Sequence, residues 1–386
     1  MGQARELRQK FHDRYGGEAR VFRAPGRVNL IGEHTDYNDG FVMPAAIGFD
    51  TWVAAAPRPD RRLLIYSENF SEEVEFDLDE ASPQPRGHWS DYVRGVAVML
   101  GRAGLRLSGA NLWICGEVPI GSGLSSSAAV EVAAGYALAG VTGLEVDPTE
   151  LAQICRRAEN EFVGARVGIM DQFVSVHGRA GHALLLDCRS LDYRLLPLPG
   201  GERLVICNTM VRHALAGGEY NRRREECEAG VRILAGKVPG VRALRDVTLA
   251  DLENYGGDLP EVVFRRCRHV VTENARVLDA AAALERGDLG AFGQLMAASH
   301  RSLRDDYEVS SAELDLMVDL ANKCAGVDGA RMTGGGFGGC TINLVAAGAV
   351  AEFEREVSRG YERTAGRAPE IYVCTAAGGA GQVGEE

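Results

Sequence analysis

The stretch of sequence that decides the fold reads Val118-Pro119-Ile120-Gly121-Ser122-Gly123-Leu124-Ser125-Ser126-Ser127-Ala128. It follows a predicted strand, residues 110–115, and leads into a predicted apolar helix over about residues 126–139. Backbone N–H groups and the positive end of that helix converge where a triphosphate can lie, while the serines add donors or a metal ligand. A helix N-cap after a glycine turn is the simpler alternative, but the density of small residues favours a phosphate-binding loop.

This loop is not a Walker A motif, because that motif requires Gly-Lys followed by Ser or Thr. The lysines of the chain are Lys10, Lys237 and Lys323, and none lies near the loop in sequence. If the protein is a kinase, the fixed positive charge must therefore come from an arginine or a metal ion. A dinucleotide-binding fingerprint also fails here, since its third glycine position is Ser126.

A second glycine-rich run reads Gly334-Gly335-Gly336-Phe337-Gly338-Gly339 and contains a literal G-x-G-x-x-G pattern. It precedes a predicted strand, residues 340–345, and does not open a β-α-β unit, so we discount it as a dinucleotide site. A tight turn between strands would explain the run. The density of glycine also fits a backbone that lies against a bulky ligand.

Two carboxylates stand out near glycine loops. Glu159 lies in a predicted amphipathic helix, residues 148–161, and Asp171 follows among apolar neighbours. The functional interpretation of Asp171 is a base or a group that orients a hydroxyl, and the alternative is a helix N-cap. For Glu159 the alternative is a solvated helix face, because Arg156 and Arg157 are close in sequence.

A third polar set consists of Glu33, His34 and Asp36, flanked by glycines. Such a set suits a polyol, because each sugar hydroxyl needs a fixed hydrogen-bond donor or acceptor. His34 is a much weaker candidate for a metal ligand. Tyr220 fits the core, the surface or a ligand contact, and the sequence leaves these open.

Composition indicates a globular protein of two domains. The 386 residues exceed the roughly 250–300 at which one hydrophobic core stops growing. The 46% of hydrophobic and 25% of charged residues exclude disorder and collagen. A net charge of −12, without a basic block, argues against nucleic-acid binding.

Cysteine usage and the N-terminus predict a cytoplasmic protein without membrane contact. The nine cysteines form no C-x-x-C pair and have no histidine at metal-ligand spacing, which indicates reduced thiols and no zinc site. The first residues run into charges without an apolar signal segment, and no apolar run reaches the length of a membrane span.

Hydrophobic periodicity predicts a mixture of strands and helices. Predicted strands cover residues 21–23, 41–56, 61–78, 110–115, 340–345 and parts of 183–207. Predicted helices cover residues 1–15, 88–101, 126–139, 148–161, 219–234, 261–286, 288–302 and 312–324. Prolines and glycines place a domain boundary at about residues 195–201, and the Gly/Ala-rich tail after Ala376 is expected to fray.

Three of these segments together resemble one family, the GHMP small-molecule kinases, and within it the galactokinases. Residues 26–40 resemble the galactokinase sugar-binding signature almost residue for residue, residues 118–128 the second, phosphate-binding motif, and residues 331–339 the third. The resemblance extends to residues 212–220, including His213, and to residues 300–310, so it covers essentially the whole chain. The first motif is highly specific, whereas the other two identify only the superfamily.

The resemblance implies an α+β, two-domain GHMP kinase fold with the active site in the cleft between the domains. Residues 1–198 would form an N-terminal mixed sheet with helices, of the ribosomal S5 domain 2-like type. Residues 199–386 would form a C-terminal ferredoxin-like domain with helical additions. Departures from the family pattern are small, notably Met210 and the pair Gly217-Gly218, and none removes a catalytic position.

The resemblance also assigns roles residue by residue. Asp171 matches the catalytic base, and Arg27 matches the arginine that stabilises the transition state. The implied sugar contacts are Glu33, His34, Thr35, Asp36, Gly168 and Tyr220. The implied nucleotide contacts are Ser67, Gly121, Ser122, Gly123, Leu124, Ser125, Ser126 and Ser127. The implied Mg²⁺ ligands are Ser127 and Glu159.

The implied activity is transfer of the γ-phosphate of ATP to the anomeric hydroxyl of α-D-galactose, giving galactose 1-phosphate and ADP in the Leloir pathway. Galactose and ATP would be the partners, Mg²⁺ the cofactor, and a monomer the default state. Two alternatives stay open: a kinase for N-acetylgalactosamine or another sugar, and a non-catalytic galactose and ATP sensor. Sensor relatives tend to lose residues of the second motif, and residues 125–128 are complete here, which favours turnover.

Overall fold

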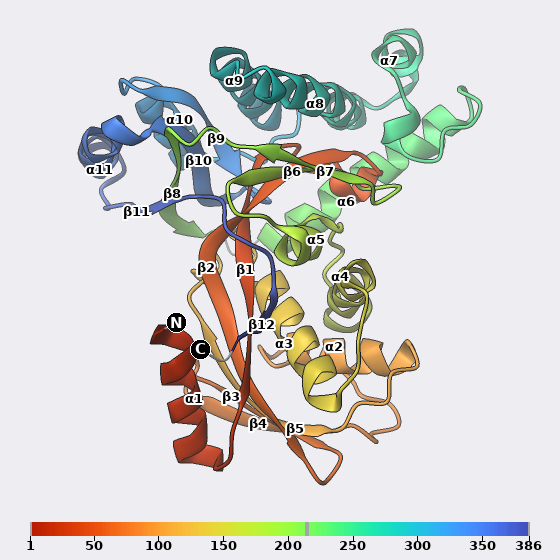
Figure 1. The fold of residues 1–386 in the computed structure, drawn as a ribbon. Helices are drawn as coiled ribbons and strands as arrows, with labels where there is room; N and C mark the ends of the chain where they lie inside the picture. Colours follow the sequence, from red (N-terminus) through yellow and green to blue (C-terminus); the bar gives the residue numbers. More distant parts are fainter. Residues whose placement is uncertain (1, 213–215, 385–386) are drawn as a thin grey trace.

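The computed structural model describes residues 2–212 and 216–384, which form two β-sheets covered by helices (Figure 1). The first sheet has, in spatial order, β12 (Gly381–Val383), β1 (Arg20–Ile31), β2 (Phe41–Arg58), β5 (Gly109–Gly116), β3 (Arg62–Ser67) and β4 (Glu72–Asp77). β6 (His182–Asp187) pairs with β2, and β7 (Tyr193–Pro197) pairs with β6. β3 runs parallel to β5 while β1 and β2 are antiparallel, so the sheet is mixed, as predicted.

Helices cover both faces of this sheet because its strands alternate two sets of apolar side chains. Val21 of β1 packs with Phe11 of α1 (Gly2–Tyr15) on one face. Phe22, the next residue, packs on the other face, in the core formed with α2 (Asp91–Arg102), α3 (Ser126–Thr142), α4 (Pro148–Arg157) and α5 (Met170–His177). Alternation in the strand thus sets two layers of helix around one sheet.

The small residues of α3 have a packing role. A Cβ added to Gly135 would lie 2.7 Å from Leu151 Cδ1, and one added to Gly140 would lie 2.5 Å from the Phe22 ring. Both distances are shorter than a real contact, so only glycine lets α3 approach α4 and β1 this closely. The helix that follows the predicted phosphate loop is therefore held firmly against the sheet.

The second sheet has the spatial order β11 (Glu370–Cys374), β8 (Glu202–Arg212), β10 (Gly338–Ala346) and β9 (Val327–Thr333). Val205 and Cys207 of β8 face α10 (Ala312–Ala321) and α11 (Val350–Ala365). Leu204 and Ile206 face the opposite way, into a core shared with β1 and β2 of the first sheet. The remaining helices are α6 (Ala216–Ala235), α7 (Leu249–Tyr255), α8 (Glu261–Glu285) and α9 (Leu289–Asp305).

Most predicted elements agree with the structure to within a few residues. The predicted strand over residues 61–78 is instead a hairpin of β3 and β4, with Ser71 in the turn at a φ of +51°. Alternation continues across this turn, which is why the sequence conceals it. α5, α7, α11, β9 and β11 were not predicted, although the buried Phe353, Val357 and Tyr361 of α11 follow helical spacing.

The prediction of a frayed tail is wrong. β12 pairs with β1 in antiparallel register, with Val383 opposite Val21. The backbone before it is also fixed, since Ala380 N–H donates to Ser175 O at 2.8 Å and Ala377 N–H to Ala46 O at 2.8 Å. Composition missed this because the tail is stabilised by backbone hydrogen bonds, which small side chains leave unobstructed.

The boundary expected between residues 198 and 199 stays a prediction. β8 begins the second sheet at Glu202, but β12 returns the end of the chain to the first sheet. Within the described ranges, no helix combines the length and apolar character needed to cross a bilayer.

Candidate active site

A cavity of about 520 Å³ lies where the loops of the first sheet meet α6 and the turn between β9 and β10. All but three of the residues predicted from the sequence line it. Those that do are Arg27, Glu33, His34, Asp36, Ser67, Gly121, Gly123, Ser125, Ser126, Ser127, Glu159, Gly168, Asp171 and Tyr220. The structure therefore brings residues from distant parts of the chain to one place.

The three exceptions support the cavity wall from behind. Thr35 is fully buried, and its hydroxyl lies 2.8 Å from Gly32 O and 2.6 Å from Phe41 O, so it closes the loop on itself. Ser122 Oγ donates to Pro119 O at 2.7 Å. Leu124 is buried in the core.

The phosphate loop is a strained turn held between two other backbones. Gly123 has a φ of +83°, and Ser125, at the N-terminus of α3, has a φ of +62°. A Cβ added to Gly26 would lie 2.7 Å from Leu124 O, and one added to Gly334 would lie 3.0 Å from Gly123 O. The three glycine-rich segments thus touch one another, with Gly334 and Gly335 on the cavity wall.

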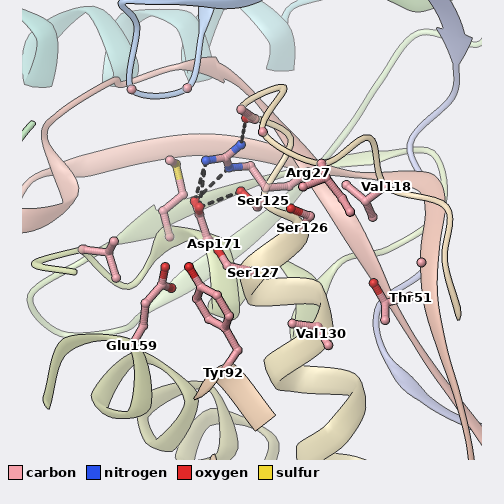
Figure 2. A pocket seen from close by; sticks show the side chains of 18 of the residues that line it. Arg27, Thr51, Tyr92, Val118, Ser125, Ser126, Ser127, Val130, Glu159 and Asp171 are labelled. Carbon is pink, nitrogen blue, oxygen red and sulfur yellow. Dashed lines mark hydrogen bonds and ion pairs between the residues drawn. The ribbon is translucent and has the colours of Figure 1, made fainter. Parts of the chain in front are cut away.

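Asp171 stands in the first turn of α5 with its carboxylate fixed by two neighbours (Figure 2). Arg27 Nε and Nη2 donate to its two oxygens, each at 2.8 Å, and Ser125 Oγ donates to Oδ2 at 2.6 Å. The Asp171 side chain is 25% exposed, toward the cavity, whereas that of Arg27 is 6% exposed. This geometry presents an oriented carboxylate that can accept a proton from a ligand.

Arg27 joins that carboxylate to the phosphate loop. Its Nη1 donates to Gly123 O at 2.7 Å. Burial disfavours the charge of the guanidinium, but the carboxylates of Asp171, Glu33 and Asp36 outweigh burial and raise the pKa of Arg27 above its ordinary value. A permanent positive charge therefore lies beside Asp171, and it comes from an arginine, one of the two sources, an arginine or a metal ion, that the sequence left open.

Glu33 and His34 form the wall next to the second sheet. Glu33 is buried, accepts from Gly334 N–H at 2.8 Å and pairs with Arg331 Nη1 at 3.5 Å. His34 has a φ of +64°, a conformation that turns the loop sharply, and its ring lies 5.5 Å from that of Tyr220. Glu33 thus fixes the loop to β9 and β10, and His34 contributes its ring to the cavity.

Asp36 lies against the backbone of Gly168. A Cβ added to Gly168 would be 1.9 Å from Asp36 Oδ2, so this position accepts only glycine while Asp36 keeps its place. Burial, together with repulsion from Asp171 and Glu33, raises the pKa of Asp36 to about 7. The absence of a side chain at Gly168 therefore leaves the space that the Asp36 carboxylate occupies.

Glu159 lies in a π-helical turn, Ala158–Val163, that continues α4 and ends at Gly164. The Ser127 hydroxyl hydrogen-bonds with its carboxylate, and Gln172 Nε2 donates to Oε2 at 2.8 Å. Burial and the nearby Asp171 raise the pKa of Glu159 to about 7. A cation at this point would relieve that repulsion, so Ser127 and Glu159 suit a hard metal ion that prefers oxygen ligands.

Comparison with known proteins bears on the whole chain. The galactokinase galactose-binding signature matches residues 9–57, the GHMP kinases N terminal domain residues 91–179, and the GHMP kinases C terminal residues 280–363. A galactokinase from Roseiflexus sp. (strain RS-1) is 49% identical over 379 residues, which cover 98% of this chain and 97% of that protein. One from Chloroflexus aggregans is 52% identical over 369 residues, covering 95% of each.

The chain belongs to the galactokinase family. A solved galactokinase from Lactococcus lactis, complexed with galactose, covers 99% of this chain and 100% of its own, with a TM-score of 0.95 and 40% identity. The mevalonate kinase of Methanococcus jannaschii covers 93% and 99%, with a TM-score of 0.65 at 19% identity, and shows the fold alone. The expected α+β GHMP kinase fold is confirmed, and the chain is a sugar kinase with ATP as co-substrate.

Sequence reasoning missed the apolar end of this galactokinase's cavity. Its aromatic side chains are Phe70, Trp89 and Tyr92, with Phe70 and Trp89 stacked at 5.6 Å and 10° between ring planes. The other lining residues to which the sequence gave no role are Thr51, Asn69, Ile114, Gly116, Val118, Ile120, Val130, Val167 and Met170. Val118 and Ile120 stand in the phosphate-binding segment, but the others lie on several elements and share no local motif.

Gln172 and Glu131 were also missed. Gln172 Nε2 donates to Glu131 Oε2 at 2.9 Å as well as to Glu159, and both Gln172 and Glu131 are fully buried. A usable signal existed, because Glu131 interrupts an otherwise apolar predicted helix and a buried carboxylate needs a partner. His213, part of the resemblance over residues 212–220, lies outside the described residues.

Proposed function

We propose that this galactokinase transfers the γ-phosphate of ATP to the anomeric hydroxyl of α-D-galactose, giving galactose 1-phosphate and ADP. The observation that carries the proposal is the Asp171 carboxylate, oriented by Arg27 and Ser125. It lies between the phosphate loop and the sugar loop, which is the connection between β1 and β2, residues 32–40. The Lactococcus lactis relative, solved with galactose, supports the choice of sugar.

Asp171 is the proposed base. It accepts or orients the proton of the anomeric hydroxyl, the most acidic hydroxyl of an aldose, as that oxygen attacks the γ-phosphorus. Arg27 holds the Asp171 carboxylate in place through two hydrogen bonds, one to each of its oxygens. The same guanidinium is fixed to Gly123 O, so it also offsets charge that grows on the transferred phosphoryl group.

The phosphate loop is proposed to hold the triphosphate. Gly121, Gly123 and the three serines present backbone N–H groups and hydroxyls at the N-terminus of α3. That helix end carries a partial positive charge that favours phosphate. Phosphoryl transfer depends mainly on alignment and charge neutralisation, so a rigid loop supplies much of the catalysis.

Ser127 and Glu159 are proposed to hold Mg²⁺. Among the described residues, no group of three or more His, Cys, Asp or Glu side chains could hold a metal ion by itself. A hydroxyl and one carboxylate fit an ion that takes its other ligands from ATP phosphates and water, as Mg²⁺ commonly does. When bound, the ion neutralises phosphate charge.

The sugar end is proposed to consist of His34, Asp36 and Tyr220, with Glu33 and Thr35 fixing the loop. Galactose hydroxyls need both acceptors and donors, and Asp36 with His34 offers them side by side. The apolar end, with Phe70, Trp89 and Tyr92, is proposed to hold the adenine, because aromatic faces stack on a nucleobase.

A monomer in the cytoplasm remains part of the proposal. The nine cysteines are free, seven of them buried, which fits a reducing compartment. Sedimentation of the purified protein tests the monomer, with a single species of about 41.5 kDa as the expected result.

ADP release tests the function. Purified protein with Mg-ATP is assayed against galactose, glucose, N-acetylgalactosamine and arabinose, with Asp171→Asn as control. ADP release with galactose, lost in the variant, is the expected result. ADP release only with N-acetylgalactosamine would overturn the substrate, and saturable sugar binding without ADP from any sugar would point to a sensor.

A further inference from the structure

Behind the sugar loop, four polar side chains form one continuous hydrogen-bonded chain. His34 Nδ1 lies 2.8 Å from Tyr37 Oη, Tyr37 Oη lies 2.7 Å from Tyr307 Oη, and Tyr307 Oη lies 3.1 Å from Cys227 Sγ. The sugar loop supplies His34 and Tyr37, α6 supplies Cys227, and the segment after α9 supplies Tyr307. Tyr307 belongs to the family-like segment, residues 300–310, to which the proposed reaction gives no role.

The inner end of the chain, Tyr307 and Cys227, is enclosed, so its members order one another. Tyr307 and Cys227 are 0% and 1% exposed, and both pack in an apolar cluster with Val309 and Leu303. The Tyr307 ring lies 4.7 Å from the His34 ring and 4.6 Å from that of His269. Each hydroxyl therefore has a fixed position, and a buried hydroxyl without a partner would be costly.

The direction of the hydrogen bonds follows from the state of His34. Burial, with the nearby His269 and Arg223, lowers the pKa of His34 to about 3, so its ring is neutral and carries one N–H. Nε2 is buried and has no hydrogen-bond partner within the described residues, and His34 lines the cavity, so Nε2 is the ring nitrogen left for a ligand. A hydrogen on Nε2 makes Nδ1 the acceptor of the 2.8 Å hydrogen bond, with the Tyr37 hydroxyl as its donor.

That assignment fixes the rest of the chain. Tyr37 has one hydroxyl hydrogen, and giving it to His34 leaves its oxygen to accept from Tyr307. Tyr307 in turn accepts from the thiol of Cys227, which is a weak donor. All the hydrogens then point toward the cavity.

We propose that Tyr37 and Tyr307 are positioning residues that hold His34 in the tautomer with its hydrogen on Nε2, so that the sugar end presents an N–H donor at this point. The inference rests on the proposed function, in which His34 contacts the sugar. His34 then donates to a hydroxyl oxygen of the sugar while the Asp36 carboxylate accepts from a hydroxyl hydrogen. With His34 in the other tautomer the two residues would both accept, and the pocket would match fewer sugar oxygens.

Three Tyr→Phe variants test the proposal, each removing one hydroxyl and keeping the ring. Tyr37→Phe is expected to raise the KM for galactose about three- to ten-fold, the usual effect of one hydrogen bond. Tyr307→Phe, one step further away, is expected to raise it about two-fold. Tyr361→Phe is the matched control. Tyr361, on α11, is also fully buried, but its hydroxyl donates to Thr209 O at 2.9 Å and is not part of the chain that ends at His34.

Steady-state kinetics separate positioning from general damage. The KM for ATP is expected to change less than two-fold in all three variants, and the KM for galactose to follow the order Tyr37→Phe, Tyr307→Phe, Tyr361→Phe. Equal rises in both KM values, or a rise in the control as large as in Tyr37→Phe, would show a merely structural role and overturn the proposal.

A tautomer measurement does not depend on turnover. Nitrogen-15 NMR of the histidine side chains, with His34→Asn to assign the signal, is expected to show a protonated Nε2 in wild type and a mixture of tautomers in Tyr37→Phe. A protonated Nδ1 in wild type, or an unchanged tautomer in Tyr37→Phe, would overturn the proposal. Wild-type protein that releases no ADP with galactose but shows the expected tautomers would instead overturn the proposed function.

Discussion

The sugar end and the nucleotide end of the cavity are built in different ways. The sugar end is a short charged run, Glu33 to Asp36, in which β9, the turn after it and α8 supply the partners that hold the carboxylate and backbone oxygen of Glu33. The nucleotide end combines a glycine turn with apolar and aromatic side chains such as Phe70 and Trp89. Directional hydrogen bonds dominate one end, and backbone shape with stacking dominates the other.

The difference shows how far the contacting groups at each end can shift before the contact is lost. Directional contacts fail when one partner moves by a fraction of an ångström, so the sugar end needs the supporting network behind it. Stacking varies slowly with position, so the nucleotide end can use side chains from separate elements. Single substitutions should therefore cost more at the sugar end and at the junction of the two ends than at the aromatic wall.

Asp171→Asn changes a residue at the junction of the two ends and should have the largest effect on activity. We expect kcat to fall about 1,000-fold, because the amide cannot accept the sugar proton, while galactose still binds with nearly unchanged affinity. ADP release gives kcat, and calorimetric titration with galactose gives the affinity. Turnover near the wild-type value would remove Asp171 from the role of base.

Glu159→Gln tests the metal side of the nucleotide end. The Mg²⁺ concentration for half-maximal activity should rise about 100-fold, since a charged ligand is lost, with the KM for galactose unchanged. Glu161→Gln is the control, because Glu161 lies in the same π-helical turn but its side chain is 47% exposed. Equal Mg²⁺ requirements in the two variants would argue against Glu159 as a ligand.

Asp36→Asn should separate binding from stability at the sugar end. Loss of the charged acceptor should raise the KM for galactose about 30-fold, with the KM for ATP unchanged. Asp39→Asn is the control on the same loop, where the Asp39 side chain is 48% exposed. A KM for galactose that stays within two-fold of wild type would remove Asp36 from the sugar contacts.

The stability of Asp36→Asn should depend on pH. The folded-state pKa of Asp36 is raised from 3.8 to about 7 by burial, so the folded protein binds this proton more tightly than the unfolded chain. Stability therefore falls as pH rises from about 4 to 7, and that loss is complete above pH 7. The variant should melt a few degrees above wild type at pH 8, with the gain disappearing toward pH 4. A gain in melting temperature that is the same at all pH values would show that it does not come from the raised pKa of Asp36.

Phe70→Ala should have the smallest effect. Loss of one stacked ring should raise the KM for ATP about five-fold and leave the KM for galactose unchanged. Tyr193→Ala controls for removal of an exposed ring, since Phe70 and Tyr193 are 48% and 42% exposed and only Phe70 lines the cavity. A rise in the KM for galactose as large as that for ATP would erase the distinction between the two ends.

The sequence predicts the sugar end and the phosphate loop well because each is one contiguous motif. Glu33, His34 and Asp36 stand together in the sequence, as do Gly121, Gly123 and the serines at 125–127, and all of these line the cavity. It predicts Asp171 and Glu159 from their place beside glycine loops. Their roles stay predictions until the variants are measured.

The rest could not be predicted, because it arises from tertiary packing. Phe70, Trp89 and Tyr92 come together only when the β3–β4 hairpin folds next to α2. Thr35 belongs to the sugar motif, yet its hydroxyl turns back to the carbonyl of Phe41. The Gly/Ala-rich tail after Ala376 was expected to fray, but it pairs with β1. The composition of the tail alone does not reveal this partner.

The contact between Gly334 and the phosphate loop has a consequence for synthesis of the chain. Gly121 and Gly123 leave the ribosome early, but the wall opposite them belongs to a turn more than 200 residues later. A nascent chain that stops before β9 has α3 and its loop without that outer wall. The cavity wall opposite the phosphate loop is therefore complete only after β9 and the turn that follows it have been synthesised.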